Sequence, residues 1–200
     1  MLTLAASARQ RGFTLVELMV TITLMALLLG LAAPAFSEWT RNAQVRTVSD
    51  TLQNGARLAQ TEAMRRNRQM VFFLSNDQGC TATTAAAANG AFWAIRSVPL
   101  LAGETAETVQ CGNLSDVAAG INISGPTAIC FNSMGRQVAN TNPGAGSATC
   151  TLASSGRSSY DLSSVSGTRP LRVLVTLGGQ VRICDPARML SASDPDGCPP

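Results

Sequence analysis

The feature that most constrains this chain is a long apolar run close to its N-terminus. Residues 13–36 have the sequence FTLVELMVTITLMALLLGLAAPAF, and no charged residue lies between Leu18 and Phe36. As an α-helix, that uncharged stretch would span about 28 Å, close to the thickness of the hydrocarbon core of a bilayer. The run therefore predicts a membrane-spanning helix.

Two residues in this run are unusual for a membrane segment. Glu17 places a carboxylate near the start of the run, and a charge at the centre of a bilayer costs about 2.5–3.5 kcal/mol on insertion scales. Pro34 lies near the end and lacks the N–H that an α-helix needs, so we expect it to kink or loosen the helix locally. Thr21 and Thr23 are tolerable because a helical threonine can bond back to its own turn.

An amphipathic helix is predicted directly after the apolar run. Between residues 37 and 68, apolar residues recur at steps of three and four, which places them on one face of a helix. These residues are Val45, Val48, Leu52, Ala56, Ala59 and Ala63. We therefore expect one long helix that ends near Arg66, apolar all round in its first half and on one face in its second.

From Met70 onward, short apolar runs separated by Gly, Asn, Ser and Pro predict β-strands. The expected strands are 69–75, 91–98, 120–124, 128–136, 159–165, 171–178 and 179–184. The pair Gly178-Gly179 predicts a hairpin over 171–184, with Leu171, Val173, Val175 and Leu177 on one face. Residues 81–91 and 139–149 are of low complexity and are expected to be mobile loops, and the tail after residue 190 is expected to have little structure beyond Cys198. The predicted fold class is α+β, a long N-terminal helix packed on an antiparallel β-rich domain with two small sheets.

The six cysteines all follow the apolar run and form no C-x-x-C pair, so zinc or iron–sulfur ligation is poorly supported. An even number of cysteines behind a membrane-targeting segment indicates three disulfides in an oxidising compartment. Six cysteines allow fifteen pairings, and the sequence does not choose among them. We favour the sequential pairs Cys80–Cys111, Cys130–Cys150 and Cys184–Cys198.

Composition argues against an enzyme and against a bound cofactor or metal. The chain contains no histidine, no cluster of carboxylates and no Gly-rich phosphate loop, which removes the common histidine-dependent catalytic and metal sites. The formal net charge is +3, and two of the positive charges, Arg9 and Arg11, lie in the first twelve residues. That balance does not by itself indicate a nucleic-acid-binding protein.

Three hypotheses account for residues 1–36. The segment could be a secretory signal, with Ala33-Pro34-Ala35 imitating a signal-peptidase site, but the apolar run is longer than usual for a signal and contains Glu17. It could be a plain membrane anchor with Glu17 at the interface. The third hypothesis rests on residues 12–17, Gly-Phe-Thr-Leu-Val-Glu, which resemble the cleavage motif of type IV prepilins.

The prepilin resemblance implies how the chain is processed and assembled. In that family the leader is removed after the glycine, the new N-terminal phenylalanine is N-methylated, and the fifth mature residue is glutamate. Here those residues are Gly12, Phe13 and Glu17, and Pro34 also fits the family's helix. The implied organisation is a leader at 1–12, a membrane and filament-core helix at 13–36, an amphipathic helix at 37–68 and a disulfide-containing pilin-like domain at 69–200.

The C-terminal half resembles the GspH/FimT group of minor pilins and pseudopilins, through FNSMGR at 131–136 and LVTLGGQVRICDPA at 174–187. The resemblance implies a minor pilin that primes or caps a type IV pilus, or alternatively a minor pseudopilin H of type II secretion. Implied partners are other pilins or pseudopilins and a prepilin peptidase. The implied location is the inner membrane, with a single span and a periplasmic domain, and then the filament.

DNA binding is a further alternative. FimT-like proteins bind DNA through a G-R-x-R motif near the C-terminus, and the matching residues here, 179–182, keep only the second arginine. The candidate DNA contacts are Arg169, Arg172, Gln180, Arg182 and Arg188. The competing interpretation is that these arginines are solvated or paired with Asp161 or Asp185.

Overall fold

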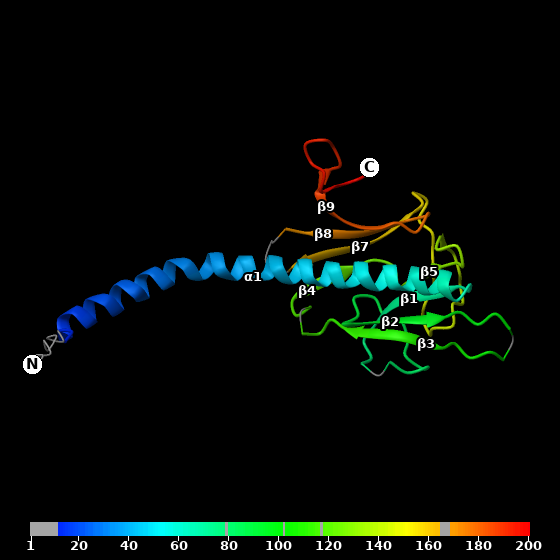
Figure 1. Cartoon of the computed structure of the whole chain (residues 1–200), viewed down its shortest axis with the longest axis horizontal. Coiled ribbons are helices and arrows are strands. Elements are labelled where there is room, and N and C mark those ends of the chain that lie inside the picture. The colour runs from blue at the N-terminus through cyan, green and yellow to red at the C-terminus, as the bar shows by residue number, and fades with distance from the viewer. Residues whose placement is uncertain (1–11, 79, 102, 117, 165–168) are drawn as a thin grey trace, which may run out of the picture. The chain divides into compact units, whose positions relative to one another are not determined.

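The computed structural model describes residues 12–78, 80–101, 103–116, 118–164 and 169–200, and its fold class is the predicted α+β (Figure 1). One helix, α1 (Leu15–Arg65), precedes all of the strands. The described strands are β1 (Met70–Ser75), β2 (Phe92–Ser97), β3 (Thr108–Asn113), β4 (Ile121–Ser124), β5 (Ala128–Phe131), β6 (Gln137–Val138), β7 (Arg157–Ser164), β8 (Leu171–Thr176), β9 (Val181–Met189) and β10 (Gly197–Cys198). The chain divides into two compact units after Trp39.

The first unit is the N-terminal half of α1, and its described residues, 12–39, are all exposed. Inside this apolar segment, the hydroxyls of Thr21 and Thr23 donate to the carbonyls of Leu18 and Val20, each at 2.9 Å. The polar atoms of both threonines are thus satisfied within the helix, as predicted. The helix continues through Pro34, so the missing N–H does not end it.

In the second unit, the rest of α1 buries one face. All six residues of the predicted apolar stripe, from Val45 to Ala63, are buried. They share one core with inward-facing residues of both sheets, among them Phe72, Phe131, Tyr160 and Val173. The periodicity of three and four residues therefore identified the buried face of the helix correctly.

Two five-stranded sheets complete the second unit. One has the strand order β3-β2-β1-β5-β6 and the other the order β10-β9-β8-β7-β4, and only the β9–β10 pair is parallel. The predicted hairpin is the β8–β9 pair, in which Val175 lies opposite Val181. Strand β10 pairs only with the second half of β9, so the first half has an open edge. Side chains of α1 cover that edge, where Arg57 Nη2 donates to the Val181 carbonyl at 2.9 Å. Covering this edge protects it from pairing with another strand.

The first sheet is buried on both faces, which explains why β1 is apolar at nearly every position. Met70, Phe72 and Leu74 face the helix, whereas Val71 and Phe73 face a second apolar cluster on the outer side. The low-complexity loops 81–91 and 139–149 cover that outer side and bury Ala86, Ala145 and Ala148 there. The expectation of mobile loops did not foresee this packing.

A buried arginine joins the two loops to the sheet. Arg96 in β2 is 0% exposed, and its guanidinium lies 5.2 Å from the centre of the Phe73 ring. It donates to the carbonyl of Thr81 at 2.6 Å and to those of Thr84 and Gly144 at 3.3 Å each. Arg96 therefore donates hydrogen bonds to carbonyls of both loop segments and links them to the sheet.

The three disulfides join Cys80 to Cys111, Cys130 to Cys150 and Cys184 to Cys198, the sequential pairs favoured from the sequence. The last bond corrects an expectation about the C-terminus. Leu174, on the opposite face of the hairpin from Val173 and Val175, is buried against Cys184 and Cys198. The tail is also ordered by pairing, since Gly197 and Cys198 form β10 against β9.

Candidate processing segment and arginine–aspartate cluster

The predicted processing residues, Gly12 and Phe13, lie just before α1. The Phe13 side chain is 83% exposed. Thr14 is the N-cap residue, because its Oγ1 accepts a hydrogen bond from the Glu17 N–H at 3.2 Å and its carbonyl accepts one from the Leu18 N–H at 3.1 Å. The peptide bond between Gly12 and Phe13 is therefore exposed and lies immediately outside the helix.

The part of α1 that lies in the first unit of the chain is apolar and fully exposed. It is long and apolar enough to cross a membrane, and none of its apolar window is buried. Phe36 and Trp39, near the end of this segment, are each 67% exposed, and their rings lie 6.1 Å apart. An apolar surface of this size is normally covered by lipid or by other helices.

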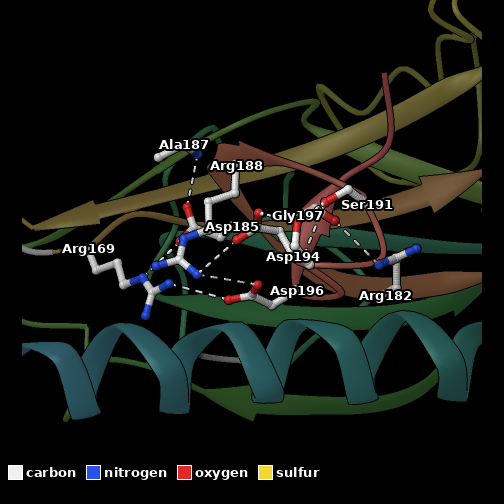
Figure 2. Close-up of polar contacts among 10 residues, drawn as sticks. Arg169, Arg182, Asp185, Ala187, Arg188, Ser191, Asp194, Asp196 and Gly197 are labelled. Atoms are coloured by element: carbon white, nitrogen blue, oxygen red, sulfur yellow. Dashed lines mark hydrogen bonds and ion pairs between the residues drawn. The ribbon is translucent and has the colours of Figure 1, made fainter.

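The C-terminal arginines lie in a different part of the molecule, and most of them contact carboxylates (Figure 2). Arg169 Nε lies 2.8 Å from Asp185 Oδ2, and its Nη2 lies 3.3 Å from Asp196 Oδ2. Arg188 lies 3.3 Å from Asp194, 3.7 Å from Asp185 and 3.7 Å from Asp196. The structure thus brings two of the predicted DNA-contacting residues together, around three aspartates. We call these five residues the arginine–aspartate cluster.

The other candidate DNA contacts lie outside this cluster. Arg172 pairs with Asp161 on the neighbouring strand, with a closest distance of 2.5 Å. Arg182 donates to the Gly197 carbonyl at 3.5 Å, and Gln180 lies in the turn between β8 and β9. Arg169, Arg172 and Arg188 together face four aspartates, so a phosphate would have to compete with carboxylates already in place. This arrangement agrees with the paired-arginine interpretation and does not favour a phosphate-binding surface.

Asp185 is the centre of the cluster. Its side chain is only 3% exposed, and its carboxylate also accepts a hydrogen bond from the Ala187 N–H at 2.9 Å. Burial alone would raise the pKa of Asp185, but the Ala187 hydrogen bond and the Arg169 and Arg188 guanidiniums together lower this pKa below its usual value. The Asp185 carboxylate therefore stays charged although it is buried, and its ion pairs with Arg169 and Arg188 stabilise the C-terminal loop.

The two C-terminal sequence stretches that resemble the GspH/FimT group lie against each other. Gly135, from the first stretch, and Gly179, from the second, both have positive φ, at 74° and 87°. A Cβ on Gly179 would collide with the Gly135 carbonyl and with the Gln60 amide, and Gln60 Nε2 donates to that carbonyl at 2.8 Å. These glycines therefore join the turns of both sheets to α1, which gives the stretches a structural role.

Several functional residues were missed by the sequence reasoning. Thr14 could have been found, because Thr-x-x-Glu at residues 14–17 is the pattern of a helix capping box. Asp194 and Asp196 lie in the tail that was expected to lack structure, and no local pattern marks them as partners of Arg169 and Arg188. Gln60 lies on the polar side of a helical pattern, which does not show that it contacts a turn far along the chain.

Comparison with known proteins gives one sequence match and two structural matches. A family model described as the prokaryotic N-terminal methylation motif matches residues 7–33. Two crystal structures of the type IV minor pilin FimU from Pseudomonas aeruginosa PAO1 are similar in structure. One, in space group P65, has 11% identity and a TM-score of 0.46, and covers 71% of this chain and 93% of FimU. The other, in space group P21, has 12% identity and a TM-score of 0.49, and covers 74% and 93%.

The matched motif includes the residues on which the sequence prediction rested. It contains Gly12, Phe13 and Glu17, and it extends into the exposed apolar half of α1. The motif and the apolar helix together fit a single-pass membrane anchor that carries a globular domain. Residues 7–33 of this chain therefore match the prokaryotic N-terminal methylation motif, which includes the residues 12–17 picked out from the sequence.

Proposed function

We propose that this protein is a minor pilin that primes or caps the assembly of a type IV pilus. The observation that carries the proposal is the contrast along α1: its first half presents the methylation motif and an apolar surface that is fully exposed, whereas its second half buries its apolar face in its own domain. The first half would lie in the inner membrane before assembly and among the helices of other pilins afterwards. The three disulfides support a domain on the oxidising, periplasmic side.

Maturation gives Glu17 its role in this proposal. Cleavage between Gly12 and Phe13 creates a new terminal amine, which stays basic after N-methylation and is positively charged at neutral pH. In a low-dielectric filament core, a carboxylate without a cationic partner is strongly penalised, and the amine of a neighbouring subunit would remove that penalty. Pairing between Glu17 of one subunit and Phe13 of the next would fix the axial register of the filament.

Substitution of Glu17 tests this role. We expect Glu17→Ala and Glu17→Gln to be cleaved and membrane-inserted but at least tenfold depleted from the sheared filament fraction, because they lose the charge that pairs with the amine. Glu38→Ala is the matched control, since Glu38 is the other exposed carboxylate in the first unit of the same helix. Normal incorporation of both Glu17 variants would refute the register role.

A minor pseudopilin of type II secretion would use the same maturation chemistry, so it remains the second candidate. The two candidates differ in the filament that needs the protein. Deletion of the gene should abolish surface pili and leave secretion through the outer membrane intact if the proposal is correct. Loss of secretion with normal pili would assign the chain to the secretion system.

A further inference from the structure

The N-cap residue of helix α1, Thr14, is the second residue after the bond that the proposed maturation cuts. Thr14 closes the first turn twice, through its side chain to the Glu17 N–H and through its carbonyl to the Leu18 N–H. In an α-helix the N-cap carbonyl is the first to accept an intrahelical bond. The Gly12 carbonyl therefore lies outside the helical hydrogen-bond ladder.

The scissile carbonyl must stay outside that ladder to react. Hydrolysis adds water to the Gly12 carbonyl carbon and breaks its bond to the Phe13 nitrogen. Gly12 then leaves as the carboxylate of the leader, and Phe13 keeps the amine. A Gly12 carbonyl that accepted a hydrogen bond from the Val16 N–H would be part of the first helical turn, and its peptide bond would have helical rather than extended geometry.

The sequence offers the helix an alternative start at that glycine. Glycine is an acceptable N-cap residue, and valine, the replacement at residue 14 used in the test below, is among the poorest. Without the cap at Thr14, the helix could begin with Gly12 as its N-cap and Phe13 as its first residue. This alternative helix would enclose the bond to be cut.

We propose that Thr14 is a specificity-determining residue for maturation, because its cap stops α1 short of the Gly12–Phe13 bond and keeps that bond open to a prepilin peptidase. The inference rests on the proposed function for the identity of the enzyme. It does not require the peptidase to contact the Thr14 hydroxyl. A residue of different chemistry that also caps well should therefore serve equally.

Four variants of the full chain test the inference, with purified prepilin peptidase and each chain in phospholipid vesicles. Thr14→Val keeps the shape of the side chain but removes the cap, and we expect cleavage to slow by roughly three- to tenfold. Thr14→Ser and Thr14→Asn keep a capping oxygen and should be cleaved at the wild-type rate. Thr21→Val is the matched control, because Thr21 in the same exposed helix also uses its hydroxyl for a local bond, at 2.9 Å.

Amide hydrogen exchange of the uncleaved chains in the same vesicles gives a readout that does not depend on the peptidase. In Thr14→Val, the Val16 amide should become protected, because it would bond to the Gly12 carbonyl. In the wild type and in the two capping variants it should exchange freely.

Three results would overturn the inference. The first is cleavage of Thr14→Val at the wild-type rate. The second is slow cleavage of Thr14→Asn together with normal cleavage of Thr14→Ser, which would show that the peptidase recognises the hydroxyl directly. The third is an exchange rate of the Val16 amide in Thr14→Val that equals the wild-type rate. If the wild-type chain is not cut after Gly12, the proposed function fails. The exchange of Val16 would still decide whether Thr14 sets the start of the helix.

Discussion

At the scale of single residues, Asp185 shows how a buried charge stabilises a loop that has little apolar core. The buried residues of the C-terminal loop, residues 190–200, are Gly197 and Cys198, and Cys198 packs against Leu174 and Cys184. The carboxylate of Asp185 holds Arg169 and Arg188, and both of these also reach Asp196. The backbone N–H of Asp185 also donates to the Asp196 carbonyl at 2.8 Å, so Asp185 bonds to Arg188 just before the loop and to Asp196 within it.

The lowered pKa of Asp185 predicts how stability depends on pH. A carboxyl group with a lower pKa in the folded state than in the unfolded state stabilises the fold above the unfolded-state pKa, which is about 3.9, and this contribution is lost as pH falls through the folded-state pKa. Asp185→Asn should lower the free energy of unfolding at pH 7 by about 1–3 kcal/mol. The difference from wild type should shrink as the pH falls below about 4, and it should be lost once the pH is below the lowered folded-state pKa, where the carboxyl is protonated in both states.

Chemical denaturation at pH 7 and at pH 3 measures both effects. Asp161→Asn is the control, because Asp161 also pairs with an arginine but is 44% exposed, and exposed pairs contribute about 0–1 kcal/mol. Equal losses for the two variants at pH 7 would show that burial of Asp185 does not matter.

At the scale of secondary-structure elements, the contact between Gly135 and Gly179 joins three parts of the fold. The β8–β9 turn lies against the turn that follows β5, and Gln60 of α1 donates to the Gly135 carbonyl between them. The Gln137 N–H in β6 also donates to the Leu177 carbonyl at 3.0 Å, which joins the first sheet to the β8–β9 turn. The backbones come this close because neither glycine has a side chain.

Substitution of Gly179 tests this junction. Gly179→Ala adds a Cβ at positive φ and against the Gly135 carbonyl, so we expect a loss of roughly 1–3 kcal/mol in the free energy of unfolding. Gly178→Ala is the matched control, because the nearest atom to its added Cβ is the Thr176 hydroxyl oxygen at 3.9 Å. If both variants are as stable as wild type, the junction does not contribute to stability.

The elements differ in how far the sequence could predict them. The buried face of α1 and strand β1 follow from local apolar patterns, and both are confirmed. Strand β3 was missed because TVQCGN has no clear alternation, and it forms through pairing with β2 and the bond from Cys111 to Cys80. The packing of the low-complexity loops was missed because it depends on Arg96, whose partners lie 12 or more residues away.

At the scale of the whole molecule, the two units differ in what their surfaces require. The second unit buries its apolar residues internally, with a shared core from α1 and both sheets. In the first unit, the described residues 12–39 are exposed, apolar side chains included, and residues 7–33 match the methylation motif. The methylation motif could be predicted from the sequence because it is a local pattern, whereas the pairing of the C-terminal arginines depends on distant aspartates.

The identity of the mature N-terminus tests the central claim most directly. The full chain, co-expressed with a prepilin peptidase and recovered from membranes, should begin at Phe13 and carry one added methyl group in N-terminal mass spectrometry. A variant with Gly12→Val should keep residues 1–12, since the bond would no longer follow a glycine. A wild-type chain cut after Ala35, as a secretory signal would be, or one that keeps its first twelve residues, would contradict the account.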